Sequence, residues 1–167
     1  MIRPAWAADL DAVAEAVTRL VAAMNAAGND QWGPTYPARS DFEADLSDGA
    51  LFVDDGEGRI RGFVALNQVE PGAYDGLPWT VDRPALVVHR LAVVPEFHRR
   101  GVADGLVTFA EDRARWLGLG GLRSDTADRN PGMNALFERR AWTRVGTLRF
   151  DDATVGFVAW EKALGLG

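Results

Sequence analysis

The residues best suited to chemistry lie in one short turn, His98-Arg99-Arg100-Gly101-Val102-Ala103, which follows an apolar run and precedes a helical stripe. Its two arginines are positively charged, and its glycine allows a ligand to approach the backbone closely. Backbone N–H groups at a helix N-terminus attract anions, and flanking arginines strengthen that attraction. The turn therefore predicts a site that a diphosphate would fit. The alternative is an ordinary strand-to-helix connection with two surface arginines.

A second segment of interest begins at Asn130-Pro131, where the asparagine can cap a helix and the proline suits its first position. Aromatic side chains with polar tips also gather in two irregular stretches rich in glycine and proline. They are Trp32 and Tyr36 within Gly28–Arg39, and Tyr74 and Trp79 within Glu70–Pro84. Such side chains suit a small-molecule pocket or a dimer contact, and they equally serve to plug the end of a sheet.

Regular elements must hold these segments in place. Helical spacing predicts helices over Ala8–Asn25 and Val102–Leu117, and a capping box at Ser40-Asp41-Phe42-Glu43 predicts a short helix before Gly49. A further short helix follows Asn130 and ends at Ala141-Trp142. The predicted strands are Ala50–Asp54, Ile60–Gln68, Ala85–Val94, Leu122–Thr126, Thr143–Phe150 and Thr154–Glu161, with a final turn at Asp151-Asp152.

This order of elements predicts an α/β (α+β) fold, in which a mixed, twisted sheet carries about four helices on its two faces. Residues 1–167 are expected to form a single domain. The one parallel crossover, from Ala85–Val94 through a helix to Leu122–Thr126, is the place where ligands collect in such sheets.

Composition limits the class of protein. The chain has 167 residues, of which 47% are hydrophobic and 25% charged, as is typical of a globular domain. No apolar run approaches the ~18 residues of a membrane span, and Asp9 and Asp11 come too early for a signal peptide, so a cytoplasmic location away from membranes is expected. The absence of cysteine excludes disulfides, thiolate metal sites and a cysteine nucleophile. A net charge of −6 argues against nucleic acid as a partner.

Two motifs resemble those of one enzyme family. The turn His98–Ala103 resembles the acetyl-CoA-binding motif of the GNAT superfamily of N-acetyltransferases, Gln/Arg-x-x-Gly-x-Gly/Ala, with His98 in its first position. The segment Asn130–Trp142 resembles the family's Asn-x-x-Ala-x-x-Leu-Tyr-Glu-Lys-Leu-Gly-Phe, with Phe137 in place of the tyrosine and Ala141 in place of the glycine. The two motifs occur in the family's order and separation. Features similar to a bacterial subgroup are Gln31-Trp32, Tyr36-Pro37 and Arg123-Ser124-Asp125-Thr126.

The resemblance implies acetyl-CoA as cofactor and a GNAT-like sheet of about seven strands, splayed between its fourth and fifth strands. It assigns cofactor binding to Leu91, Ala92, Val93, His98, Arg99, Arg100, Gly101, Val102, Ala103, Asp104, Asn130 and Phe137. A bulge in Ala85–Val94 would expose backbone groups at Leu91–Val93, which pair with the pantetheine arm as an added strand would. A backbone N–H there, such as that of Leu91, would stabilise the oxyanion formed during amine attack. Otherwise these side chains are plain core, Asn130 is only a helix cap, and Phe137 cannot donate a proton.

An amine with a pKa near ~10 needs a base or a water route before it can attack. Asp125 aligns, by its distance from Asn130, with the glutamate base of ribosomal-protein N-acetyltransferases, and its alternative role is to brace a loop. Glu70 is the second candidate and is otherwise a solvent-facing side chain. His89 is the third and is otherwise a core histidine.

These inferences lead to an enzyme that transfers an acetyl group from acetyl-CoA to a primary amine by direct attack in a ternary complex. Trp32, Tyr36, Tyr74 and Trp79 are its predicted substrate contacts, the acceptor is a small-molecule or peptide amine, and a homodimer is compatible with the aromatic loops. The alternative is a catalytically weak acyl-CoA-binding or sensing protein of the same fold, which the departure at Phe137 keeps open.

Overall fold

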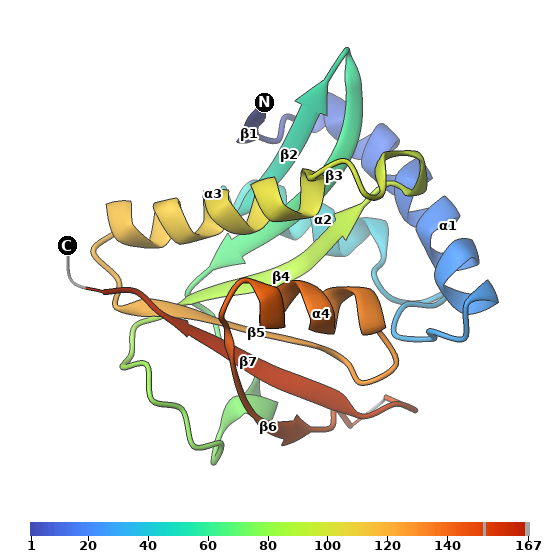
Figure 1. The fold of residues 1–167 in the computed structure, drawn as a ribbon. Helices are drawn as coiled ribbons and strands as arrows, with labels where there is room; N and C mark the ends of the chain where they lie inside the picture. The colour runs from blue at the N-terminus through green and yellow to red at the C-terminus, as the bar shows by residue number, and fades with distance from the viewer. Residues whose placement is uncertain (152, 166–167) are drawn as a thin grey trace. The chain divides into compact units, whose positions relative to one another are not determined.

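The computed structural model describes residues 1–151 and 153–165. The chain divides into two compact units, one formed by residues 1–66 and 89–109 and the other by residues 67–88 and 110–167. Strand β4 (Leu86–Val93) and helix α3 (Val102–Trp116) contribute residues to both units. In the described residues, the strands follow the hydrogen-bonded order β1-β2-β3-β4-β5-β7-β6 (Figure 1), which confirms the predicted mixed sheet of about seven strands.

The first unit is built on antiparallel strands. Its strands are β1 (Ile2–Pro4), β2 (Leu51–Gly56) and β3 (Arg59–Asn67), and its helices are α1 (Leu10–Ala26) and α2 (Arg39–Ser47). Figure 1 shows β2 and β3 as a hairpin, in which Phe52 pairs with Val64. The three-residue strand β1 adds to β2 at the edge of this hairpin and was not predicted, because three residues are too few to show alternation.

The start of α2 differs from the predicted capping box. The helix begins at Arg39, and its cap is Ala38, whose extended backbone precedes the first turn. The backbone N–H of Ala38 donates to the Asp41 carboxylate at 2.6 Å, so Asp41 takes the part expected of a residue three positions into the helix. Ser40 is therefore the second helical residue rather than the cap, which corrects the sequence-based assignment.

The second unit holds the parallel pairing. Its elements are β5 (Gly121–Ala127), α4 (Pro131–Arg139), β6 (Thr143–Leu148) and β7 (Phe157–Ala163). Strand β7 runs antiparallel to both β5 and β6, and the start of β4 pairs in parallel with β5 from Leu86↔Leu122 to Val88↔Ser124. This register covers only the first three residues of β4, in agreement with the expected splay between the fourth and fifth strands.

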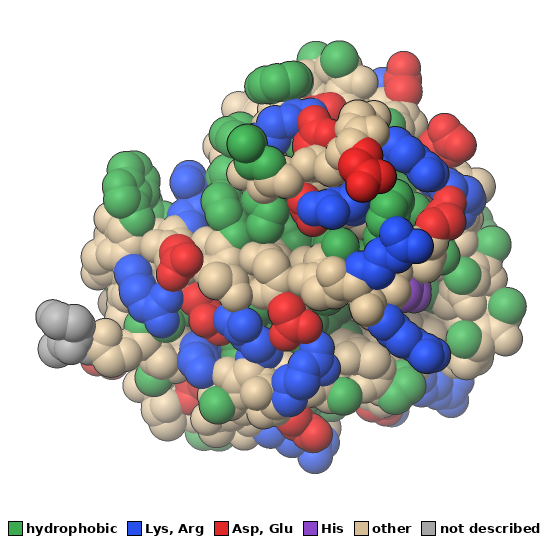
Figure 2. All heavy atoms as spheres, turned by 45° about the horizontal axis from the view of Figure 1, so that its top comes forward, with side chains coloured by type: hydrophobic (Ala, Val, Ile, Leu, Met, Phe, Trp, Pro, Cys, Tyr) green, Lys and Arg blue, Asp and Glu red, His purple; other side chains and the backbone are tan. Residues whose placement is uncertain are grey.

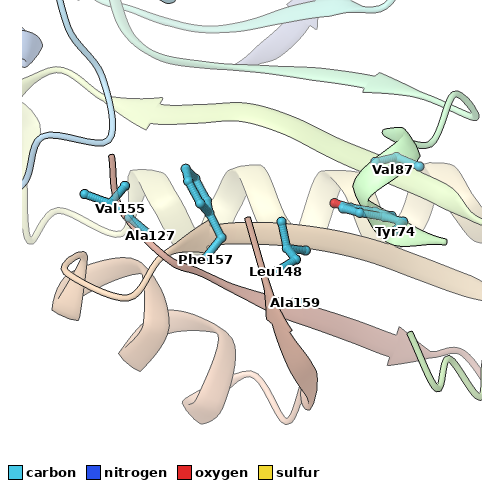
Figure 3. Close-up of a cluster of buried hydrophobic side chains, with 7 residues drawn as sticks. All are labelled: Tyr74, Val87, Ala127, Leu148, Val155, Phe157 and Ala159. Atoms are coloured by element: carbon cyan, nitrogen blue, oxygen red, sulfur yellow. The ribbon is translucent and has the colours of Figure 1, made fainter. Parts of the chain in front are cut away.

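A buried apolar cluster forms part of the core of the second unit (Figure 3). It combines Tyr74 from the β3–β4 loop with side chains of β4, β5, β6 and β7 and of the chain before β7, namely Val87, Ala127, Leu148, Val155, Phe157 and Ala159. The β3–β4 loop is thus packed into the core through Tyr74. The predicted turn at Asp151-Asp152 falls partly outside the described residues, because Asp152 is not among them.

The surface mixes charges of both signs. Figure 2 shows basic and acidic side chains next to one another on the face it draws, with hydrophobic side chains among them. Neighbouring charges of opposite sign weaken the long-range field of each. Within the described part of the chain, no helix is long and apolar enough to cross a membrane.

Candidate active site

The predicted phosphate turn lies in the first unit, between a 3-10 helix, η3 (Pro95–Phe97), and helix α3. The backbone is left-handed at Arg99 (φ 58°) and at Gly101 (φ 77°), a conformation that favours glycine. A Cβ added at Gly101 would have no heavy atom within 4 Å, so the space beside this backbone is open. The first N–H groups of α3 have no partner within the helix. An open turn at a helix start, flanked by exposed arginines, has the features of an anion-binding site.

His98 stabilises this turn. Its ring nitrogen Nε2 lies 2.8 Å from the carbonyl oxygen of Val93, the last residue of β4. Arg99 and Arg100 are exposed, and the Arg100 guanidinium lies 5.6 Å from the ring centre of Phe97. The histidine at the first motif position thus ties the turn to the end of the strand, while the two arginines remain accessible.

Strand β4 is irregular at the position where the resemblance implies a bulge. Arg90 has a left-handed backbone (φ 49°) in the middle of the strand, directly before Leu91. Its guanidinium donates to both oxygens of Asp45, at 2.7 and 2.5 Å, and to the hydroxyl of Tyr36 at 3.1 Å. This ion pair between the buried Asp45 and the half-buried Arg90 helps to hold the irregular backbone in place.

The side chains after this irregularity differ in burial. Leu91 is half-buried, whereas Ala92 and Val93 are buried among the core residues of the first unit. The side chains of Ala92 and Val93 therefore serve packing, and any contact of these two residues with a ligand has to come from their backbone.

In the second unit, the predicted base Asp125 meets the predicted substrate residue Tyr74. The Tyr74 hydroxyl donates to Oδ2 of Asp125 at 2.7 Å. Burial raises the pKa of Asp125 to about 6, and the hydrogen bond from Tyr74 opposes that rise. Burial, followed by the charge of Asp125, raises the pKa of the Tyr74 phenol well above its ordinary value. A carboxyl group with a pKa near 6 can exchange protons at neutral pH.

The other predicted base, Glu70, is held by two arginines. Its Oε1 accepts from Nη1 of Arg123 at 2.7 Å, and its Oε2 accepts from Nε and Nη2 of Arg83 at 2.9 and 2.6 Å. Arg123 is buried, donates to the carbonyl of Val81, and lies 4.6 Å from the ring centre of Trp79. Both oxygens of Glu70 therefore accept hydrogen bonds from arginines, whereas Asp125 accepts its hydrogen bond at one oxygen.

A third carboxyl group, that of Glu161 in β7, anchors the same loop. It is buried and accepts hydrogen bonds from the backbone N–H groups of Thr80 and Val81 and from the Thr80 hydroxyl. Glu161 pairs with Arg123 in the β5–β7 register. Side chains of adjacent strands thus hold the β3–β4 loop at two neighbouring points.

The second motif forms helix α4. Asn130 caps it, as predicted, because its Oδ1 accepts from the N–H of Met133 at 3.2 Å. Phe137 is buried, with its ring 4.6 Å from that of Trp142 and 5.8 Å from that of Trp160. The residue in the place of the family's tyrosine is therefore a core residue, and it brings no hydroxyl to the site.

The four predicted aromatic contacts fall into two pairs. In the second unit, the rings of Tyr74 and Trp79 lie 4.9 Å apart. In the first unit, Trp32 is buried and stacks on Phe63 at 6.3 Å, which fits its alternative role as a plug, whereas Tyr36 is 44% exposed. Two further candidates lie in regular elements: His89 is half-buried in β4, and Asp104 occupies the first turn of α3.

Sequence reasoning missed the anchoring roles of Arg123 and Glu161. Both lie in strands that were predicted, and Arg123 is two residues from Asp125, so the two side chains share a face of β5. A charged residue two positions from a candidate base, in a strand otherwise expected to be buried, is the signal that was available. For Glu161, the available signal was a glutamate near the end of an apolar strand.

Comparison with known proteins agrees with this geometry. The sequence model of the Acetyltransferase (GNAT) family matches residues 17–142, a span that includes both motifs. The chain belongs to this acetyltransferase family. The predicted resemblance is confirmed, and with it the assignment of the protein as an acyltransferase, for which the family implies acetyl-CoA as the acyl donor.

Solved structures show the same fold. A GNAT-family acetyltransferase from Streptococcus agalactiae superposes with a TM-score of 0.85 at 24% identity, over 99% of this chain and 96% of the other. One from Listeria monocytogenes gives a TM-score of 0.76 at 19% identity, over 98% and 94% of the two chains. The ribosomal-protein-S18-alanine N-acetyltransferase of Escherichia coli gives 0.72 at 15% identity, over 100% and 95%. No curated protein matched the sequence.

Proposed function

We propose that this GNAT protein transfers the acetyl group of acetyl-CoA to a primary amine, by direct attack within a ternary complex, with Asp125 as the general base. One observation carries the proposal: the Asp125 carboxyl group is placed by a hydrogen bond to one oxygen, and its pKa is about 6. It is therefore mainly deprotonated at pH 7 and can take a proton from the attacking nitrogen.

The other residues of the chain bind and orient the reactants in this proposal. Acetyl-CoA supplies the acetyl thioester. Gly101 and the start of α3, with Arg99 and Arg100, hold its diphosphate. The backbone of Leu91–Val93, after the irregularity at Arg90, offers hydrogen bonds to its pantetheine arm and to the thioester carbonyl. Trp79, which is half-buried, offers apolar surface near the base, whereas Tyr74 is buried in the core and is not the substrate contact that was predicted.

The test is the release of free CoA from acetyl-CoA in the presence of a panel of small amines and N-terminal peptides. Asp125→Asn is expected to bind CoA with unchanged affinity and to turn over about 10²–10⁴-fold more slowly, which is the usual loss when a general base is removed. The acidic limb of the pH–rate profile is expected to disappear with it. Near-normal turnover of a folded Asp125→Asn protein would contradict the assignment of the base.

One observation favours a second candidate function, that of an acyl-CoA-binding or sensing protein of the same fold. Phe137 is enclosed by Trp142 and Trp160, so the position that carries a proton donor in the family has none here. Calorimetric titration with CoA and with acetyl-CoA, run beside the CoA-release assay, separates the two functions. Tight binding without turnover on any amine of the panel would favour the sensor.

A further inference from the structure

Tyr74 is held by the packing of its ring and by hydrogen bonds at its backbone carbonyl and its hydroxyl. Its ring packs into the apolar core shown in Figure 3, and no part of the residue is accessible to solvent. Its backbone carbonyl accepts from Nε1 of Trp79 at 2.9 Å, and its hydroxyl donates to Asp125 at 2.7 Å. The loop residue and the strand residue are therefore held together with little freedom to move.

The hydrogen bond occupies only one oxygen of the Asp125 carboxyl group. Among residues 1–151 and 153–165, no donor reaches the other oxygen, Oδ1. A carboxylate oxygen that is left without a donor is the one that can receive a proton. The Tyr74 phenol keeps its own proton at neutral pH, because burial and the nearby carboxyl raise its pKa.

The charged groups around this pair come from three elements. Glu70 in the β3–β4 loop raises the pKa of Tyr74, and Arg123 in β5 lowers it. From β7, the residue opposite Asp125 is the apolar Ala159, and Glu161 lies opposite Arg123. Asp125 thus has one direct hydrogen-bond donor, Tyr74, and the other charges around the pair are bound to each other or to the backbone.

We propose that Tyr74 is a positioning residue for Asp125: its hydroxyl holds Oδ2 and so presents Oδ1 to the acceptor amine. The inference rests on the proposed function, since it assumes that Asp125 takes the proton. A phenylalanine would fill the same apolar space without burying a hydroxyl. The hydrogen bond to the Asp125 carboxyl group therefore explains why a hydroxyl is present at this buried position.

The experiment compares Tyr74→Phe with the unsubstituted protein by two readouts. The first is the pKa of the Asp125 carboxyl group, followed by ¹³C NMR with labelled aspartate and assigned with Asp125→Asn. The second is the acidic limb of the pH profile of kcat/KM. Because the lost hydrogen bond favoured the ionised form, both are expected to move to higher pH by about one unit. At pH 7, turnover falls, and raising the pH restores part of it.

A matched control removes a different hydroxyl from the same loop. Thr80→Val deletes the bond from the Thr80 hydroxyl to Glu161 and leaves the Tyr74–Asp125 pair intact. In Thr80→Val, the pKa of the Asp125 carboxyl group and the acidic limb of the pH profile of kcat/KM are expected to be unchanged. If Thr80→Val shifted both values as Tyr74→Phe does, general loosening of the loop would explain the effect and the proposal would be overturned.

A second perturbation keeps the proposal testable if Tyr74→Phe does not fold. The chain contains only two tyrosines, so both can be replaced with 3-fluorotyrosine during expression. The fluorinated phenol is a stronger donor, and the carboxyl pKa is expected to fall, opposite to the effect of Tyr74→Phe.

The outcomes separate the two claims. An unchanged carboxyl pKa in both perturbed proteins overturns the positioning role, even if acetyl transfer is demonstrated. A shifted carboxyl pKa with an unmoved acidic limb also overturns it, because the carboxyl group is then not the base. Absence of acetyl transfer by the unsubstituted protein overturns the proposed function itself.

Discussion

Replacing Asp125 with asparagine should stabilise the fold at neutral pH while it abolishes the proposed base. The carboxyl group has a pKa of about 6 in the folded protein, against an ordinary value of 3.8. Its ionised form is therefore disfavoured by folding, since burial removes the carboxylate from water. An asparagine has the same shape, carries no charge, and can accept the hydrogen bond from Tyr74.

The size of the effect follows from the two pKa values. A difference of about two units corresponds to about 3 kcal/mol of unfavourable free energy at pH 7. The sign follows from proton binding: between pH 4 and pH 6 the folded state binds more protons at this carboxyl group than the unfolded state does. Ionisation of Asp125 therefore destabilises the folded protein increasingly as pH rises through that window. This penalty is absent below pH 4, where the group is protonated in both states. Asp125→Asn should gain up to about 3 kcal/mol at pH 7 and nothing at pH 4.

Urea unfolding of both proteins between pH 4 and pH 8 measures this difference directly. The exposed Asp82 of the same loop provides the control, because replacing an exposed side chain in Asp82→Asn should change the unfolding free energy only slightly. An Asp125→Asn protein less stable than its parent at pH 7 would refute the reasoning. That result would mean that the carboxylate only braces the loop.

Three further predictions follow from other parts of the structure. Gly101→Val should abolish CoA binding, measured by titration calorimetry, and should lower the unfolding free energy by about 1–2 kcal/mol because the backbone at this position is left-handed. Arg100→Ala should weaken CoA binding by about 1–3 kcal/mol. Unchanged CoA affinity in both variants would contradict the proposed diphosphate site. Asp45→Ala should destabilise the fold by about 3–5 kcal/mol in urea unfolding, because the half-buried Arg90 guanidinium loses its ion pair and keeps only the Tyr36 hydroxyl as a partner. A loss below about 1 kcal/mol would contradict this. Phe137→Tyr should lower the unfolding free energy by about 1–3 kcal/mol without raising turnover, and a faster variant would show that proton donation at this position limits the rate.

The elements that hold the site were largely predictable from the sequence, because each has a strong local signal. Alternating or dense apolar residues marked the strands, and Asn130-Pro131 marked the start of α4. The turn at Gly101 was found from residue types alone, and its left-handed backbone explains why glycine stands there. The family resemblance contributed Asp125, which residue patterns did not single out.

The contacts between distant residues were not predictable in the same way. Tyr74 and Asp125 are 51 positions apart, and no local pattern pairs a loop tyrosine with a strand aspartate. Glu70 was expected to be either a solvent-facing side chain or a general base, and its ion pair with Arg123, 53 positions away, was not foreseen. Such partners are selected by tertiary packing, which a single sequence does not encode in its spacing.

The interactions that hold the β3–β4 loop differ in their sensitivity to ionic strength. Arg123–Glu70, Tyr74–Asp125 and the bonds to Glu161 are shielded from solvent, whereas Arg83 is 59% exposed. Mobile ions screen exposed charges within about 10 Å at 0.1 M and act much less on buried ones. High ionic strength should therefore release Arg83 and leave the base in place. Any dependence of the reaction rate on salt then reports the charge of the arriving acceptor and of CoA, which makes ionic strength a simple probe of the acceptor's chemistry.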